Sequence, residues 1–290
     1  MPSVLADFVA YVFVETEEWD GPQKGRVLVN ETQLVVAIDE DQKTVISLDT
    51  IFDINIGHKP QFVDSMPGTP VTVGFTAENT RATAVVSTDE QTSEKFRAVI
   101  FKAILNGTYT MLKHPAKVGG RVLDTEFEAS LLALQSGSVS FDTDEGPLQI
   151  SLDSVIDFSR ETRTVDGDER LVLVVSHVDT GEAMTTVAAM DSARKLSLLG
   201  RYMRRRYQRV INSLEQLTLS EQETEVLTTL YSVGDSDISL PGVLGLEPKM
   251  VKQLLTSLHE NGLIESGDHG PVLTARGQIV VNQYLERVNA

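Results

Sequence analysis

The sequence predicts an α+β protein with two duplicated β domains, each closed by a C-terminal helix, and a third domain that is mainly helical. Three observations support this class: a motif that occurs twice, short β-type segments separated by turns, and a C-terminal series of capped amphipathic helices. The chain has 290 residues, which is enough for two or three domains with cores of their own.

The repeated motif reads ISLDTIFDI at residues 46–54 and ISLDSVIDF at residues 150–158, a spacing of 104 residues with five identical positions. At the same spacing, and without a gap, the apolar pattern of residues 25–45 matches that of residues 129–149. A self-similar segment of this size indicates a duplicated structural unit. We therefore predict two homologous domains in tandem, with the motif serving the same strand–turn–strand in each.

In both copies, runs of β-branched and aromatic residues alternate with turn residues, as in antiparallel sheets. A helix that ends at about Asn106-Gly107 follows the first set, and a helix from Asp191 to about Asn212 follows the second. Six or seven strands closed by one helix is the pleckstrin-homology-like (PH-like) arrangement. We predict PH-like β-barrel or sandwich domains at residues 1–113 and 114–212; a small barrel or sandwich of another topology is the alternative.

The last segment predicts a winged helix-turn-helix domain at residues 213–290. Ser220 and Glu223 have the spacing of a capping box at the start of an amphipathic helix. A short second helix follows, and the third begins with Pro248 and ends at Asn261-Gly262. A hairpin then leads into a final helix at residues 274–288.

Charge argues against nucleic acid as a partner. The chain has a formal net charge of −17, and residues 214–290 contain four Lys or Arg against eleven Asp or Glu. Because DNA-binding domains neutralise phosphates with several Lys and Arg, we expect this winged helix to bind protein, with DNA binding as the alternative. Phosphoinositide binding is also disfavoured, since the loop at residues 16–22 is acidic and only Lys24 and Arg26 follow it.

The sequence nominates no catalytic residue, metal site or cofactor. It has no cysteine, and its five histidines are scattered without the spacing of a metal site. Phosphate-binding glycine loops and nucleophile elbows are absent as well. With no apolar run long enough to span a membrane and no basic signal segment, we expect a non-enzymatic, cytoplasmic protein without direct membrane insertion.

The densest basic run, RYMRRRYQR at residues 201–209, lies in the helix predicted to close the second domain. An apolar stripe at helical spacing leaves the arginines on the opposite face. This face is interpreted either as a solvated surface or as a docking surface for an acidic partner. The candidate docking residues are Arg201, Arg204, Arg205 and Arg209.

Three segments carry a resemblance to a known family: residues 22–37, residues 105–124 and the repeated SLD-x-x-x-D. Together they resemble the archaeal taxis protein CheF family over the whole chain, most specifically in HPAKVGG at residues 114–120. The family favours a basic residue after GR-[IV]-L, where this chain has residues 30–34, NETQL. We interpret HPAKVGG as an inter-domain linker with a fixed proline dihedral and a sharp glycine turn. The linker residues are His114, Pro115, Lys117, Gly119 and Gly120.

The resemblance implies a non-enzymatic adaptor that binds the phosphorylated response regulator CheY and links it to the archaellum switch complex, so that motor rotation can switch. It also implies a homodimer at the cytoplasmic face of the motor. The winged helix is the expected CheY-docking part, with Lys249, Lys252 and Arg276 as candidate contacts, because Lys and Arg recognise phosphate and carboxylate groups. Docking through apolar contacts, a transcription regulator and a scaffold unrelated to taxis are the alternatives.

Overall fold

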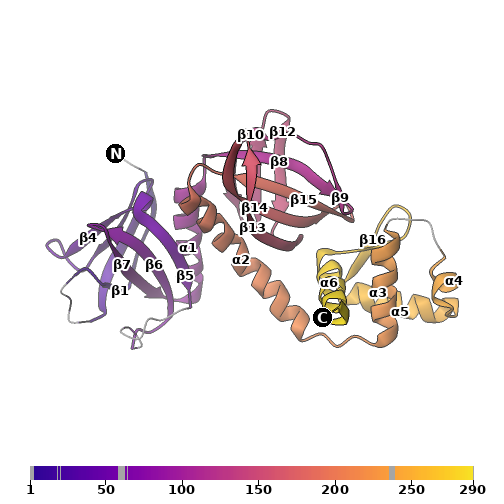
Figure 1. Ribbon diagram of the computed structural model, residues 1–290. Coiled ribbons are helices and arrows are strands. Elements are labelled where there is room, and N and C mark those ends of the chain that lie inside the picture. Colours follow the sequence, from indigo (N-terminus) through magenta and orange to yellow (C-terminus); the bar gives the residue numbers. More distant parts are fainter. Residues whose placement is uncertain are drawn as a thin grey trace. The chain divides into compact units, whose positions relative to one another are not determined.

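The computed structural model describes residues 3–17, 19, 21–57, 63, 65–234 and 239–289 (Figure 1). It is a mixed α and β structure with two large antiparallel sheets, a two-stranded hairpin and several helices. The chain forms two compact units. Unit 1 contains residues 1–108, 132–134 and 192–202, and unit 2 contains residues 109–131, 135–191 and 203–290.

The sheet of unit 1 has the strand order β4-β3-β2-β1-β7-β6-β5. Helix α1 packs against it and buries Phe96, Ile100, Phe101 and Ile104. Within the described part of the unit, the edge strands β4 and β5 are not paired with each other, so the sheet does not close into a barrel. The bounds are β1 Val4–Val14, β2 Gln23–Asn30, β3 Gln33–Ala37, β4 Lys43–Ser47, β5 Ile51–Ile56, β6 Thr69–Ala77, β7 Thr80–Thr88 and α1 Glu90–Leu105.

The second sheet repeats this arrangement in the order β12-β11-β10-β8-β15-β14-β13, with β9 paired to β8. Its edge strands, β12 and β13, are likewise unpaired with each other among the residues described. The bounds are β8 Thr108–Val118, β9 Arg121–Val122, β10 Glu128–Gln135, β11 Ser138–Thr143, β12 Gly146–Ser151, β13 Val155–Val165, β14 Asp168–Asp179, β15 Glu182–Ala189 and α2 Ala193–Glu215.

The repeated motif forms the same turn in both sheets. In the first copy a 3-10 turn, η1 (Leu48–Thr50), follows β4, and Thr50 Oγ1 donates to the carbonyl oxygen of Ser47 at 2.8 Å. In the second copy Ser154 Oγ donates to the carbonyl oxygen of Ser151 at 2.9 Å. The leucine between them is buried in each case. The motif therefore has a structural role, as predicted.

The ungapped match between the copies is wrong by one residue outside the motif. It aligns Val27 with Leu131, yet Val27 is fully buried, Leu131 is 49% exposed, and the buried equivalent is Leu132. Within the motif the spacing holds, since Ile46 and Ile150 are both buried. The cause is the β11–β12 turn, which is one residue shorter than the β3–β4 turn. A one-residue shift moves every side chain of a strand to the other face.

The C-terminal elements follow the predicted order of helices and hairpin. The predicted capping box is present: Ser220 Oγ accepts from the backbone N–H of Glu223, and the Glu223 carboxylate accepts from the backbone N–H of Ser220. Pro248 opens the third helix, and Gly262 follows its end with a positive φ of 67°. The bounds are α3 Glu221–Val233, α4 Leu240–Leu244, α5 Pro248–Glu260, β16 Ile264–Ser266, β17 Pro271–Leu273 and α6 Ala275–Asn289.

Across the residues that the structure describes, no helix is both long and apolar enough to cross a membrane.

Candidate functional site

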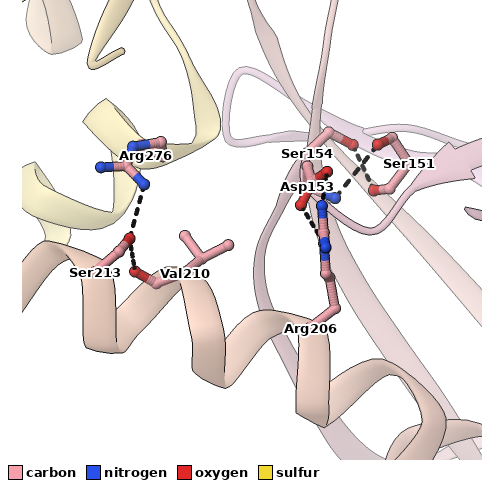
Figure 2. A network of polar contacts seen from close by, with 7 residues as sticks. All are labelled: Ser151, Asp153, Ser154, Arg206, Val210, Ser213 and Arg276. Atoms are coloured by element: carbon pink, nitrogen blue, oxygen red, sulfur yellow. Dashed lines mark hydrogen bonds and ion pairs between the residues drawn. The ribbon is translucent and has the colours of Figure 1, made fainter. Parts of the chain in front are cut away.

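The second half of helix α2 is held to the repeated motif of its own unit. Arg206 Nε and Nη2 donate to the two carboxylate oxygens of Asp153 at 2.6 and 2.7 Å (Figure 2). Hydrogen bonding to Arg206 keeps the pKa of Asp153 below its usual value. Phe158, five residues after Asp153, packs edge-to-face on Tyr207 with ring centroids 5.5 Å apart.

The first half of α2 makes corresponding contacts in unit 1. Arg194 Nη1 donates to the carbonyl oxygens of Ile51 at 2.6 Å and Leu48 at 3.3 Å. Arg201 Nη1 lies 2.8 Å from Asp53 Oδ1 in an ion pair. Burial lowers the pKa of Arg194, because its guanidinium is partly withdrawn from water.

The predicted arginine docking face is thus largely engaged with the chain itself. Arg201 pairs with Asp53, and the Arg204 guanidinium carbon lies 6.0 Å from the centre of the Phe158 ring. Arg205 and Arg209 also interact with other residues of the chain. These contacts favour an intramolecular role for the basic run over docking of an acidic partner, since an ion pair must be broken before Arg201 could bind one.

The residues interpreted as an inter-domain linker lie in a strand instead. His114, Pro115 and Lys117 belong to β8, and Lys117 is opposite Thr185 of β15. Gly119 and Gly120 form the turn to β9 with positive φ, as the predicted sharp turn requires. Only Asn106 and Gly107 connect α1 to β8, which begins at Thr108 and ends at Val118. The expected boundary at residue 113 therefore falls within β8. The expected boundary at residue 212 falls within α2.

The C-terminal helices share a hydrophobic core with the second sheet. Val226, Leu227 and Leu258 of the helices belong to the same buried cluster as Ile156 of β13 and Val178 of β14. Burial of this kind stabilises the folded state in proportion to the apolar area removed from water. Residues 213–290 are therefore packed into unit 2.

The β14–β15 hairpin contacts β17 closely. A Cβ atom at Gly181, in the hairpin turn, would lie 2.9 Å from Val272 Cγ2. Gly181 also has a φ of +81°, which disfavours any other residue. The β14–β15 turn thus packs against β17 at Val272.

Helix α5 presents the two predicted lysines to solvent. Lys249 and Lys252 are both exposed, and three residues apart they lie on neighbouring positions of one helix face. Neither makes an ion pair with any residue that the structure describes. On the opposite side of α5, Val251 and Leu258 are buried in the core.

The third candidate, Arg276, occupies a different setting. It lies at the start of α6, is half-buried, and donates from Nη1 to Ser213 Oγ of α2 at 2.8 Å (Figure 2). Ser213 in turn donates to the carbonyl oxygen of Val210. Arg276 therefore connects α6 to α2, whereas the side chains of Lys249 and Lys252 have no hydrogen-bond partner among the residues that the structure describes.

Exposed apolar side chains accompany the lysines on the C-terminal helices. Val243 of α4 is 60% exposed, Tyr231 near the end of α3 is 43% exposed and Met250 of α5 is 37% exposed. Helix α4 contacts both α3 and α5. We use the name α5 surface for these exposed residues of three helices that contact one another (Tyr231, Val243, Lys249, Met250 and Lys252).

Two histidines meet inside the second sheet. His114 Nδ1 and His177 Nε2 lie 2.8 and 3.0 Å from the same hydroxyl, Thr186 Oγ1, and their rings stack with centroids 5.8 Å apart. The pKa of His177 is lowered to about 4, mainly by burial and also by the neighbouring His114, while Asp179 opposes the shift. Burial also lowers the pKa of the half-buried His114, so burial favours the neutral form of both rings.

A groove of about 630 Å³ in unit 2 is lined by Asp157, Tyr207, Ile279 and Glu286, among others. Burial, followed by Asp157 and Glu286, raises the pKa of Tyr207, so its hydroxyl stays protonated. Within the described ranges no group of three His, Cys, Asp or Glu residues is placed to hold a metal ion. His58 lies outside those ranges.

Comparison with known proteins identifies the family. Residues 4–209 match the family model described as Archaeal Chemotaxis signal transduction system protein F. The chain belongs to the archaeal CheF family. It is 35% identical to Taxis protein CheF2 of Halobacterium salinarum (strain ATCC 29341 / DSM 671 / R1) over 287 residues, 99% of each chain. It is 29% identical to Taxis protein CheF1 of the same strain over 244 residues, 83% of this chain and 81% of that protein.

These matches give this CheF protein a role in archaeal chemotaxis signalling. The family model ends at residue 209, before the C-terminal helices, whereas the match to CheF2 extends over them. The α5 surface therefore lies in a segment that the chain shares with CheF2 but that falls outside the family model.

Proposed function

We propose that this CheF protein is a non-enzymatic adaptor that binds phosphorylated CheY and links it to the switch complex of the archaellum. In this proposal it acts as a homodimer at the cytoplasmic face of the motor. The two sheet-and-helix domains are PH-like and provide the dimer and motor contacts. The C-terminal elements form a winged helix-turn-helix domain that receives CheY.

The observation that carries the proposal is the α5 surface. Lys249 and Lys252 are exposed next to apolar side chains, in a region with four Lys or Arg against eleven Asp or Glu. A phosphorylated response regulator presents carboxylates and phosphate beside the face that changes on activation, and ammonium groups recognise such charge. Apolar residues such as Met250 and Val243 suit the packed centre of an interface.

Arg276 has a different role in this proposal. Its hydrogen bond to Ser213 holds the start of α6 against α2, so we assign it a positioning role and place the direct contacts on Lys249 and Lys252. We assign the arginines of α2 to intramolecular contacts for the reason given above.

Charge and packing disfavour the transcription-regulator alternative. The β16–β17 hairpin, which would be the wing, carries Glu265 and Asp268, and Val272 of its strand β17 packs against the β14–β15 turn at Gly181. A wing that contacts DNA needs an accessible and basic tip, because phosphate neutralisation dominates affinity. If CheY does not bind, the alternative of a scaffold unrelated to taxis is favoured.

The test is titration calorimetry of the full chain with CheY from the same organism, with and without beryllofluoride. The full chain is needed because Ile156 and Val178 complete the core of the C-terminal helices. Activated CheY should bind more tightly than inactive CheY, and Lys249→Glu with Lys252→Glu should weaken binding at least about tenfold. No binding of CheY in either state would refute the adaptor function.

The matched control is Lys95→Glu with Lys102→Glu on α1. This double variant makes the same change in net charge on another helix. If it weakens CheY binding as much as the α5 variant does, the effect is one of net charge and the assignment of the α5 surface is wrong.

A further inference from the structure

Strand β1 is only partly covered on one of its edges. It pairs with β2 over nearly its whole length, but its pairing with β7 begins at Tyr11↔Ser87 and runs only to Val14↔Ala84. Among the described residues, Val4–Ala10 therefore have no strand partner on the β7 side. An open edge of this kind is a template for an additional strand.

The backbone groups of this edge point outward in a regular pattern. Glu15 N donates to the carbonyl oxygen of Thr83 in the connection that follows the β1–β7 ladder. Because backbone groups two residues apart in a strand point the same way, Tyr11 faces β7, and Asp7 and Val9 face the open edge. Their N–H and C=O groups are therefore available to an incoming strand.

A groove of about 450 Å³ lies beside this edge. Residues 5–8 of β1 line one side, and Thr92, Lys95, Val99 and Lys102 of α1 line the other. These α1 residues recur at intervals of three and four, so they lie along one helix face. Phe8 and Phe96 meet edge-to-face in the groove, with centroids 5.2 Å apart. We call this feature the β1–α1 groove.

The charge of the groove is positive although the chain is acidic. Lys95 is exposed and Lys102 is half-buried, and neither forms an ion pair with any residue that the structure describes. The one acidic side chain that lines the groove, Asp7, is paired with Arg26. The groove therefore offers two ammonium groups and an apolar floor, against a background net charge of −17.

The second copy of the domain provides an internal comparison. There β15 pairs with β8 as far as Met111↔Ala189, which leaves only residues 108–110 of β8 beyond the last pair. The corresponding overhang in β1 is residues 4–10. The long open edge is thus a property of the first copy and not of the duplicated architecture.

We propose that the β1–α1 groove binds an extended segment of a partner protein that alternates acidic and apolar residues. The segment adds to β1 as a further strand, its backbone pairs with Asp7 and Val9, its apolar side chains enter the groove, and its carboxylates meet Lys95 and Lys102. This is binding by strand addition, in which the backbone supplies affinity and alternate side chains supply specificity. A second copy of this chain fits the groove less well. Its own β1 has only one carboxylate to place against Lys95 and Lys102, that of Asp7, and this carboxylate is already paired with Arg26.

The first experiment measures fluorescence anisotropy of a labelled, acetylated Glu-Val-Glu-Val-Glu-Val-Glu peptide with the full chain. A Lys-Val peptide of the same length is the charge control. The Glu-Val peptide should bind at least about tenfold more tightly, and Lys95→Glu with Lys102→Glu should remove that difference. Lys249→Glu with Lys252→Glu should leave it unchanged, so this result is independent of CheY binding.

The second experiment tests the backbone contact. Val9→Pro removes the N–H that faces the open edge, and proline is tolerated at such edge positions, whereas Val9→Ala keeps it. Val9→Pro should weaken binding of the Glu-Val peptide at least about tenfold, and Val9→Ala should leave this binding unchanged. If Val9→Pro fails to fold, N-methylation of alternate residues of the peptide removes the same hydrogen bonds and should weaken binding instead.

Amide hydrogen exchange gives the decisive readout. Asp7 and Val9 should exchange fast in the free chain and become protected when the Glu-Val peptide is added. Equal affinity for the two peptides would overturn the proposal. Protection that rises with protein concentration in the absence of peptide would also overturn it, because a second copy of the chain would then be the occupant.

Discussion

Arg206 and Asp153 form a two-point ion pair in which Arg206 Nε donates to Asp153 Oδ1 at 2.6 Å and Nη2 donates to Oδ2 at 2.7 Å. Asp153 belongs to the repeated motif, and Arg206 belongs to the basic run. Both side chains keep about half of their surface in water, at 43% and 54% exposure. The pair therefore fixes the orientation of α2 against the β12–β13 turn while contributing modestly to stability.

A double-mutant cycle should measure that contribution. Arg206→Ala, Asp153→Ala and the double variant are compared by chemical denaturation of the full chain. Because exposed pairs are screened by water, we expect a coupling energy of about 0.5–1 kcal/mol, at the upper end for such pairs owing to the bidentate geometry. Additive single effects would show that the pair holds geometry without adding stability.

The pKa of Asp153 should respond to the same substitution. Hydrogen bonding to Arg206 keeps this pKa low, so Arg206→Gln should raise it toward the ordinary value of an aspartate. Because the folded-state pKa is depressed, the stabilisation is present above the unfolded pKa and is lost as pH falls through the folded pKa. Carboxyl NMR titration measures the shift. Asp89, whose low pKa arises from hydrogen bonds with Thr92, should not respond.

Local features of the fold could be predicted from the sequence because their causes are local. The capping box needs only Ser220 and Glu223 at the right spacing, and Pro248 and Gly262 mark the ends of α5 through their own backbone preferences. The repeated motif likewise predicts two equivalent turns, and Leu48 and Leu152, at the same position of the motif, are both buried.

Tertiary pairings could not be predicted in the same way. Asp53 and Asp153 both belong to the repeated motif, but only the fold shows that they pair with Arg201 and Arg206. One feature of the sequence does point to these ion pairs: the repeated motif contains aspartates, and the predicted helix at residues 191–212 is rich in arginine, so the two carry opposite charge. The proline and glycine content of HPAKVGG predicts a linker. Strand β8 nevertheless continues through Pro115 to Val118, so only the two glycines form a turn.

The buried histidine makes stability depend on pH. His177 is neutral in the fold, with a pKa lowered to about 4, and it gains a proton more readily when unfolded. Stability should therefore be constant above about pH 6.5 and fall between there and about pH 4, with a slope on the order of 1 kcal/mol per pH unit. Chemical denaturation across that range measures the slope, and His177→Gln should flatten it. An unchanged slope in the variant would assign the pH dependence to other groups.

The contact between Gly181 and Val272 should determine how firmly the C-terminal helices are held to the second sheet. Gly181→Ala adds a methyl group 2.9 Å from Val272 Cγ2 and also strains a backbone with φ of +81°. We expect a loss of roughly 2–4 kcal/mol, of which about 1 kcal/mol arises from the backbone and the rest from overpacking. Hydrogen exchange should place the loosening in β17 and α3.

Gly120→Ala is the matched control for that prediction. Gly120 has nearly the same backbone angle, with φ of +83°, but a Cβ atom there meets nothing within 4 Å. Its substitution should therefore cost only the backbone strain of about 1 kcal/mol and should leave exchange in β17 unchanged. Because the two glycines differ in contact and not in φ, the difference between the variants isolates the hairpin contact. Equal losses for the two variants would mean that the β14–β15 turn yields to the new methyl group and that Ile156 and Val178 hold the C-terminal helices without it.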